Sequence, residues 1–283
     1  MAASRMSQWG NDLYTGRRSY PIVGLRRRWY AVSAVLLILS ALLLLVRGIN
    51  PSIDFRGGAE FTLSNVATTS QQPAIDAVKA IVPDEEPRVT VVGGTSLRVQ
   101  TGTLEDARLA EVKTALAAAY GIPESQVSSS FVGPNWGADV SSKAIRGLVV
   151  FLVLVSLVMT VYFRAWRMAA AAVVALLHDL VITVGLYAGI GWEVSPATVI
   201  GFLTILGYSI YDTVVVFDKV RENTEKAVDQ KRYTYAELAN LAVNQTLVRS
   251  INTSVVALLP VAGILFIGAF LLGAGTLRDI ALA

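Results

Sequence analysis

Five apolar runs, each close to the length of a bilayer-spanning helix, constrain this sequence more than any other feature. About 20 mainly apolar residues are needed to cross a membrane as an α-helix. The runs are Trp29–Val46, Ile145–Phe163, Met168–Ile190, Pro196–Phe217 and Ile251–Leu272. Hydrophobic residues make up 54% of the chain and charged residues 16%, against about 25% charged residues in soluble domains. The sequence therefore predicts a polytopic α-helical membrane protein.

The two ends of the chain add one helix to this count. The first run lacks the small-residue cleavage site of a signal peptide and is too long for one, so we expect a retained helix. A sixth run begins at Gly273, and the sequence stops within it at Ala283. We therefore expect a six-helix half-transporter bundle whose last helix, residues 273–283, is truncated here.

The distribution of Lys and Arg predicts the orientation in the membrane. Six arginines lie in residues 1–28, two flank the turn after the second run, and six basic residues lie in residues 218–250. Cytoplasmic loops carry an excess of such residues. We therefore expect a multi-pass protein of the cytoplasmic membrane with its N-terminus in the cytoplasm, which places residues 47–144 on the outer side.

The segment 47–144 is long enough for one small α+β domain. Its alternating and helical apolar patterns predict the order strand, helix, strand, strand, helix, strand, and Gly93-Gly94 predicts a hairpin turn. The predicted elements are Ala59–Ser64, Gln71–Val82, Arg88–Val92, Ser96–Gln100, Glu105–Tyr120 and Gln126–Val132. This order is typical of a ferredoxin-like, split βαβ domain.

Residues 218–250 form the longest segment on the cytoplasmic side. The segment is strongly charged at first, and after Thr234 an amphipathic helical pattern follows. We expect this helix to lie along the membrane surface, before the next spanning helix begins at Ile251.

Asp212 is the main candidate for chemistry. It lies inside the fourth run, six residues before Asp218, or about 9 Å below the predicted cytoplasmic end. Thr204 and Tyr208 precede it at four-residue intervals and share its helix face. A carboxylate at membrane depth costs about 2.5–3.5 kcal/mol on insertion scales, which makes it a functional candidate. The alternative is a buried polar anchor that only fixes helix packing.

Two further groups could act with Asp212. Arg249 opens the fifth run near the expected depth of Asp212 and could pair with it. Asn252 follows about one turn deeper. The alternative is that Arg249 reaches lipid phosphate at the membrane surface. His178 and Asp179 lie inside the third run, where a histidine could relay protons. A hydrogen-bonded structural pair is the alternative.

Several chemistries are excluded or disfavoured. The chain has no cysteine and one histidine, so we expect no metal site. It contains neither a GxxxxGK[ST] phosphate loop nor a GxSxG nucleophile motif. Gly57-Gly58 is too short for a nucleotide fingerprint and predicts a tight turn. We therefore expect a non-enzymatic protein without a cofactor, driven by an ion gradient.

Local motifs give a resemblance to a known family. SIDFRGGAEF (Ser52–Phe61), which contains Asp54, Phe55, Gly57 and Gly58, resembles the G-x-D-F-x-G-G segment of the SecF family. Further segments resemble that family in the same order along the chain: VGP (Val132–Pro134), LLHDLVIT (Leu176–Thr183), GYSIYDTVVVFDKVREN (Gly207–Asn223) and NQTLVRSINTS (Asn244–Ser254). The helical plan also resembles half of a resistance–nodulation–division transporter.

The resemblance implies a function in protein export. It implies that SecD, the SecYEG channel, the SecA motor and a preprotein are partners, with YajC open as another and no nucleic acid. It also implies proton-motive force as the energy source, Asp212 as the carboxylate that takes and releases a proton, and Arg249 as its charge partner. Tyr208, His178, Asp179, Thr204 and Asn252 would be relay or packing groups.

The sequence departs from the family pattern at two positions, and two other functions remain as alternatives. Ser52 stands where the family has Gly, and Tyr211 replaces the common Asn beside Asp212. A half-size exporter of small molecules or lipids is the first alternative, and a scaffold without transport is the second. The residues leave protons and sodium ions open as coupling ions.

Overall fold

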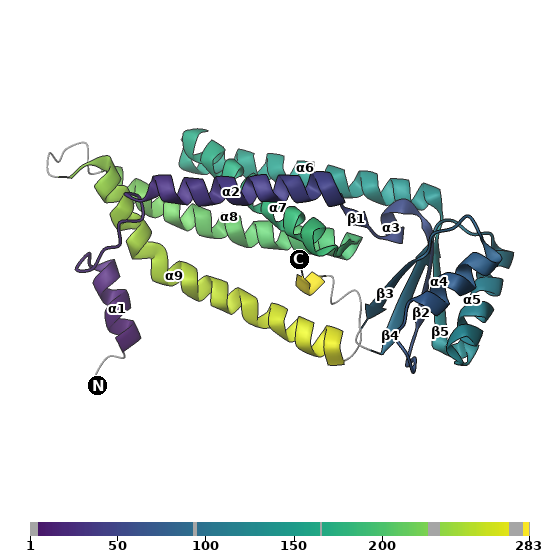
Figure 1. The fold of residues 1–283 in the computed structure, drawn as a ribbon. Coiled ribbons are helices and arrows are strands. Elements are labelled where there is room, and N and C mark those ends of the chain that lie inside the picture. The colour runs from purple at the N-terminus through teal and green to yellow at the C-terminus, as the bar shows by residue number, and fades with distance from the viewer. Residues whose placement is uncertain (1–4, 93–94, 165, 226–232, 272–279, 283) are drawn as a thin grey trace.

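A long helical bundle and a small sheet-containing region make up the molecule. The computed structural model describes residues 5–92, 95–164, 166–225, 233–271 and 280–282. The sheet lies at one end of the bundle, and the N-terminal helix lies at the other (Figure 1). Five helices of the described residues are long and apolar enough to cross a membrane. This confirms the prediction of a polytopic helical membrane protein; most of the predicted sixth run lies outside the described residues.

The bundle consists of five long helices, preceded by the short α1 (Arg5–Tyr14). They are α2 (Arg26–Arg47), α6 (Pro134–Phe163), α7 (Trp166–Ile190), α8 (Pro196–Glu225) and α9 (Tyr235–Gly263), after which a π-helix covers Ile264–Leu271. The π-helix follows Pro260, which has no N–H to donate to the ladder of an α-helix. Helix α2 packs mainly against α7, and α8 packs against α9.

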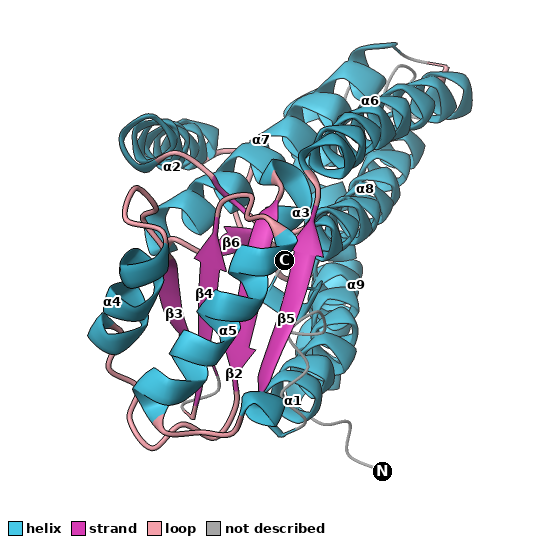
Figure 2. Ribbon diagram, turned by 90° about the vertical axis from the view of Figure 1, so that its right-hand side faces the viewer, coloured by secondary structure: helices cyan, strands magenta, loops and turns pink. Residues whose placement is uncertain are grey.

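Residues 58–132 form the sheet domain, whose order of elements is the predicted one. Its strands are β2 (Gly58–Leu63), β3 (Arg88–Val92), β4 (Ser96–Thr101) and β5 (Val127–Val132); its helices are α4 (Gln72–Ile81), α5 (Asp106–Tyr120) and a 3₁₀ turn at Glu124–Gln126. The sheet is antiparallel with the order β3-β4-β2-β5. Both α4 and α5 cover the same face of it (Figure 2). The predicted Gly93-Gly94 turn lies outside the described residues.

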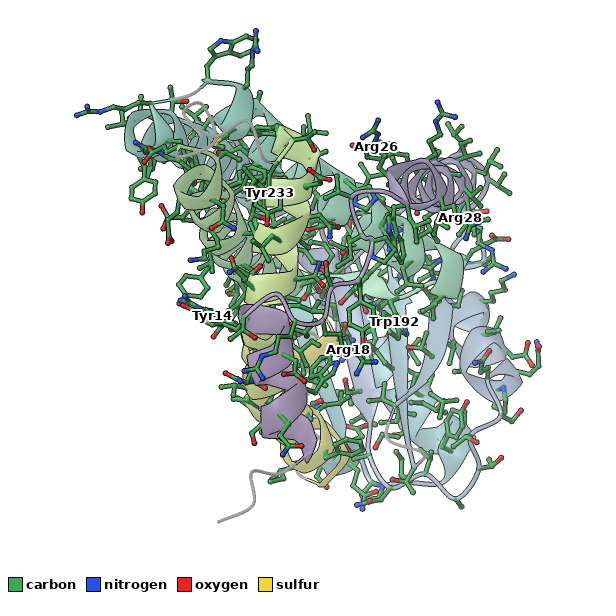
Figure 3. All side chains as sticks on the ribbon, turned by 90° about the vertical axis from the view of Figure 1, so that its left-hand side faces the viewer. Tyr14, Arg18, Arg26, Arg28, Trp192 and Tyr233 are labelled. Carbon is green, nitrogen blue, oxygen red and sulfur yellow. The ribbon has the colours of Figure 1, made fainter. Side chains whose placement is uncertain are left out.

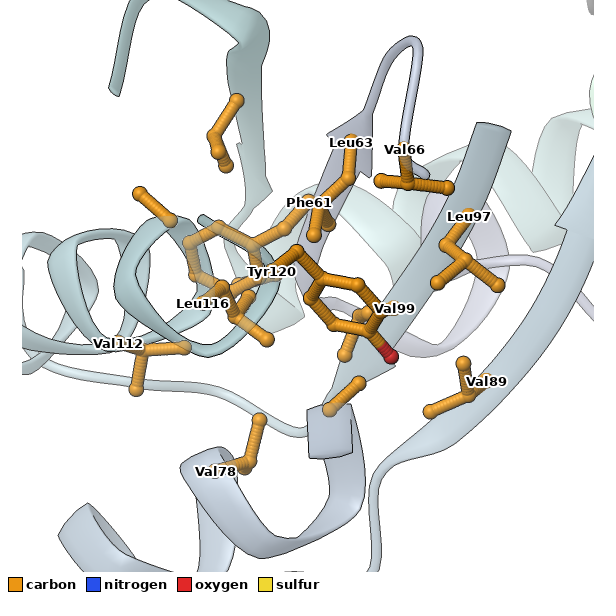
Figure 4. Packing of buried hydrophobic residues seen from close by; sticks show 14 of the residues in the cluster. Phe61, Leu63, Val66, Val78, Val89, Leu97, Val99, Val112, Leu116 and Tyr120 are labelled. Carbon is orange, nitrogen blue, oxygen red and sulfur yellow. The ribbon is translucent and has the colours of Figure 1, made fainter. Parts of the chain in front are cut away.

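One face of this sheet forms a closed apolar core. Alternate residues of β2 and β4, among them Phe61, Leu63, Leu97 and Val99, point toward the helices and are fully buried (Figure 4). Val112 of α5 and its neighbours close the other side of the core. Because the side chains of a strand alternate between faces, Glu60, Arg98 and Gln100 lie on the opposite face.

Two helices extend beyond the predicted apolar runs. Helix α6 begins at Pro134, eleven residues before the predicted start at Ile145, so it runs directly from the sheet domain into the bundle. Helix α9 begins at Tyr235 and contains both the predicted surface helix and the predicted spanning helix. Thr234 and Glu237 form a capping box at its start, and neither Pro nor Gly interrupts it before Pro260.

The first part of α9, which the sequence analysis expects to lie along the membrane surface, contacts the N-terminal segment of the chain. Asn244 is fully buried; its Oδ1 accepts from the backbone N–H of Tyr20 at 2.8 Å, and its Nδ2 donates to the carbonyl of Tyr20 at 3.0 Å. Asn240 accepts from the N–H of Val23 at 3.0 Å. Figure 3 views this end of the molecule, where Arg18, Arg26 and Arg28 lie.

Close packing of α2 on α7 depends on small residues. A Cβ added at Gly185 would lie 2.3 Å from the Cβ of Ser40, and one at Gly189 would lie 2.9 Å from Leu43. Gly185 and Gly189 are four residues apart on one helix face, the small-residue spacing that lets membrane helices approach closely.

Candidate ion-coupling site

Asp212 faces a cavity between α8 and α9. The cavity has a volume of about 740 Å³. Its lining is mostly apolar, and its polar members include Thr204, Tyr208, Ser209, Asp212, Thr213, Thr253 and Ser254. The predicted stripe of Thr204, Tyr208 and Asp212 therefore faces one space. The hydroxyl of Thr204 donates to the carbonyl of Ile200 at 2.8 Å.

The carboxylate of Asp212 is not fully satisfied. Its Oδ1 is buried and has no hydrogen-bond partner within the described part of the chain. A buried polar atom without a partner is costly, and in apolar surroundings the cost is greatest for an ionised group.

Arg249 does not reach Asp212 in this structure. Its Nη2 donates to the hydroxyl of Tyr211 at 2.9 Å, and its guanidinium carbon lies 5.9 Å from the centre of that ring. The predicted ion pair between Arg249 and Asp212 is therefore not formed here, because the neighbouring tyrosine takes the guanidinium. Tyr211 is one of the two positions at which the sequence analysis expects a departure from the family pattern. Arg249 and Asn252 line a separate cavity of about 1170 Å³, to which Tyr208 and Tyr211 also contribute.

A chain of hydrogen bonds joins three helices near Asp212. His178 Nε2 lies 2.6 Å from Ser33 Oγ on α2, and His178 Nδ1 lies 3.1 Å from Asp179 Oδ1. Ser209 Oγ on α8 donates to Asp179 Oδ2 at 2.6 Å. Ser209 is one turn from Asp212 and lines the same cavity. The predicted pair His178 and Asp179 is thus brought close to the cavity.

Sequence reasoning missed Ser33 and Ser209. For Ser209 a local signal existed, because it lies three residues before Asp212 on the same helix. Ser33 carries no such signal: its partner His178 is 145 residues away, and only the packing of α2 on α7 brings the two together.

The residues of the double-glycine motif form a tight corner far from Asp212. Asp54 and Phe55 belong to the short helix α3 (Ile53–Arg56), and Asp54 Oδ2 accepts from Ser52 Oγ at 3.1 Å. Gly57 and Gly58 have φ values of 77° and 130°, and a Cβ at Gly58 would lie 2.3 Å from the carbonyl oxygen of Thr101. Glycine is required at this corner because other residues rarely adopt such values.

Comparison with known proteins gives consistent matches. The sequence model of the C-terminal region of SecD/SecF protein export membrane proteins matches residues 111–283, and the model of the SecD/SecF double-glycine motif matches residues 42–64. Protein translocase subunit SecF of Streptomyces coelicolor is 46% identical over 281 residues, which are 99% of this chain and 74% of that protein. The SecF subunit of Mycobacterium tuberculosis H37Rv is 43% identical, over 95% of this chain and 63% of that protein.

A solved structure supports the same relationship. The crystal structure of SecDF from Thermus thermophilus, described as a translocon-associated membrane protein, matches with a TM-score of 0.81 and 33% identity. The match covers 94% of this chain and 35% of the SecDF chain. These relatives favour the protein-export hypothesis over a half-size exporter of small molecules. This chain belongs to the SecD/SecF family of protein export membrane proteins and is similar there to SecF translocase subunits.

Proposed function

We propose that this chain is the SecF-type half of an ion-driven export device, with Asp212 as the group that binds and releases the coupling ion. The Oδ1 of Asp212, buried and without a hydrogen-bond partner among the described residues, carries the proposal, together with the cavity between α8 and α9 that Asp212 lines. One charge that crosses 100 mV supplies about 2.3 kcal/mol, so a single intramembrane carboxylate is a sufficient coupling group.

Arg249 and the hydrogen-bond chain complete this site. Arg249 alternates between Tyr211, its partner in this structure, and Asp212, where it would stabilise the carboxylate over the carboxylic acid. Ser33, His178, Asp179 and Ser209 supply donors and acceptors along which a proton can reach the cavity. Thr204, Tyr208 and Asn252 line the cavities and serve as polar contacts for the ion or the bundle.

The assembly around the chain follows from its family. SecD is the expected partner, and together the two subunits assist the SecYEG channel and the SecA motor, with YajC as a further candidate. The names SecF and SecDF of the relatives support the pairing with SecD. The match to SecDF covers 35% of that chain, so the chain corresponds to part of a larger unit.

The proposed setting is the cytoplasmic membrane, with the N-terminus inside and the sheet domain outside. Arg26 and Arg28 at the start of α2, and Lys219 and Arg221 near the end of α8, lie at the end of the bundle away from the sheet domain (Figure 1), as expected for the cytoplasmic side. We assign the sheet domain to the ferredoxin-like class, because its strand order is β3-β4-β2-β5 and both helices cover one face. We also propose that the bundle has six helices and that the protein has no enzymatic activity.

Replacement of Asp212 by Asn tests the proposed function. Export of a signal-bearing preprotein is followed in cells depleted of the native protein, together with membrane level and co-purification with SecD. We expect Asp212→Asn to assemble normally but to lose export by up to about fiftyfold, the equivalent of about 2.3 kcal/mol. Asp218→Asn is the matched control, six residues further along α8, and should export normally.

The outcomes separate the hypotheses. Normal export by Asp212→Asn would mean that the chain is a scaffold and that the coupling claim is wrong. If export stalls, the same assay in membrane vesicles with either a proton or a sodium gradient identifies the ion.

A further inference from the structure

A cluster of charged and polar side chains joins the sheet domain to the bundle. Arg98 Nη1 donates to Glu193 Oε2 at 3.1 Å, and Gln100 Nε2 donates to Glu193 Oε1 at 2.6 Å. Gln100 also donates to Glu60 Oε2 at 2.9 Å, and Arg98 Nε lies 3.3 Å from Glu60 Oε1. We call these four residues, Glu60, Arg98, Gln100 and Glu193, the junction cluster.

Its members come from the two parts of the molecule. Glu60, Arg98 and Gln100 lie on the face of the sheet that α4 and α5 leave uncovered. Glu193 lies in β6 (Glu193–Val194), within the connection between α7 and α8. The side chains of Arg98 and Glu193 are each only 13% exposed. Loss of Arg98 would leave the carboxylates of Glu60 and Glu193 without this cation, whereas loss of Glu193 would leave Arg98 with Glu60.

The connection that carries Glu193 is itself held firmly. Strand β6 pairs in parallel with β1 (Asn50–Pro51), and the N–H of Ser52 donates to the carbonyl of Val194 at 2.9 Å. Trp192 packs edge-on against Tyr187, with the ring centres 5.2 Å apart. At the start of α8, Ser195 Oγ accepts from the N–H of Thr198 at 3.2 Å. Glu193, three residues before the start of α8, is thus held to α8 through Ser195 and Thr198 and also to β1 and α7.

Helix α8 links the junction cluster to the proposed ion site. It begins at Pro196 and carries Asp212 sixteen residues later, about 24 Å along the axis. Among the described residues, the junction cluster forms side-chain contacts between the sheet domain and the α7–α8 turn.

We propose that the ion pair between Arg98 and Glu193, supported by Gln100 and Glu60, is the positioning contact that makes the sheet domain follow the ion-driven displacement of α8. This inference rests on the proposed function, because it assigns a route by which occupation of Asp212 reaches the outer side. Arg98 and Glu193 are therefore positioning residues that act through other groups.

A double-mutant cycle on export tests the contact. Arg98→Ala, Glu193→Ala and the double variant are compared in the full chain with SecD, with the ion gradient intact and collapsed by an ionophore. We expect each single variant to lose about tenfold of the gradient-dependent part of export, and the double variant no more than the worse single variant. The gradient-independent part and the membrane level should be unchanged, which a purely structural defect would not produce.

A second ion pair supplies the control. Arg108 and Glu111 on α5 lie 2.9 Å apart but are about half exposed, so their removal should leave export unchanged. Where an alanine variant lowers the membrane level, Glu193→Gln decides instead, because it keeps the volume and the bond from Gln100 while it removes the charge.

The outcomes separate this inference from the proposed function. Gradient-dependent export that survives in Glu193→Ala and Glu193→Gln while Asp212→Asn is defective overturns the junction but leaves the function of Asp212 in place. Losses of the two single variants that add in the double variant overturn it as well, since the residues would then act separately. If Asp212→Asn is also unaffected, the proposed function itself fails.

Discussion

The sheet domain and the bundle bury their apolar residues in opposite ways. Phe61, Leu63 and Leu97 are fully buried between one sheet face and two helices. Leu45 and Val46 of α2 are 82% and 83% exposed, as suits side chains that face lipid. The hydrophobic effect in water stabilises the sheet domain, whereas helix contacts in a bilayer depend on close packing and hydrogen bonds.

This difference assigns different tasks to the two parts. The closed core of the sheet domain favours motion as one rigid body. The bundle includes groups that can exchange partners, such as Arg249 on Tyr211 and Asp212, whose Oδ1 has no partner among the described residues. An ion site belongs in the part that can rearrange, and the junction cluster is the place where the two parts meet.

The largest effect is expected from Phe61→Ala in the core of the sheet domain. Loss of a fully buried aromatic side chain costs about 3–5 kcal/mol. Hydrogen–deuterium exchange on the full chain in detergent should show lost protection in β2, β4 and α5, and unchanged protection in α8. Phe131→Ala, on β5 and 44% exposed, is the matched control and should lose far less. If α8 loses protection as well, the two parts do not fold as separate units.

A smaller effect of the same kind is expected in the bundle from Gly185→Ala. The new Cβ would lie 2.3 Å from the Cβ of Ser40, so α2 must move away from α7. Overpacking of this kind costs about 1–3 kcal/mol, and it should lower the unfolding temperature of the purified protein in detergent.

Gly147→Ala on α6 should act in the opposite direction. A Cβ there meets no heavy atom within 4 Å, and alanine favours a helix over glycine by about 0.5–1 kcal/mol. Equal responses of Gly147→Ala and Gly185→Ala would contradict the view that close approach of α2 to α7 holds the bundle together.

The same contrast explains what the sequence could predict. In the sheet domain each element shows its apolar face locally, and the predicted helix Gln71–Val82 differs from α4 by one residue at each end. In the bundle, apolar runs locate helices but not their ends: α6 continues into polar residues back to Pro134, and α9 begins at Tyr235. Hydropathy marks the part of a helix within lipid, whereas hydrogen bonding and capping set its length.

Contacts between distant segments could not be predicted in this way. Asp212, His178 and Asp179 are recognisable because polar residues are rare in apolar runs. The bond from Arg249 to Tyr211, rather than to Asp212, depends on the relative rotation of α8 and α9. The contact of Arg98 with Glu193 spans 95 residues, and no local pattern marks either of them.

The smallest effect is expected at the junction cluster, from the pH dependence of Glu60→Gln. Burial raises the pKa of Glu60 above 4.5; Arg98 and the bond from Gln100 oppose the rise, and Glu193 and Asp54 add to it. A folded-state pKa above the unfolded value means that this group contributes stability below pH 4.5 and loses it as the pH rises through the folded pKa. Thermal unfolding of the full chain from pH 4 to pH 8 should therefore shift in favour of Glu60→Gln as the pH rises.

The sign of that shift bears on why the junction cluster is charged. Glu111→Gln, about half exposed on α5, is measured beside it as the control for loss of a surface carboxylate. A trend in the opposite direction would mean that the ionised cluster stabilises the fold, and its charges would then need no role in transmission. The expected trend would mean that Glu60 is kept at some cost in stability near neutral pH. A charged contact that lowers the stability of the fold is not explained by stability. The specific connection that it makes between the sheet domain and α8 explains it better.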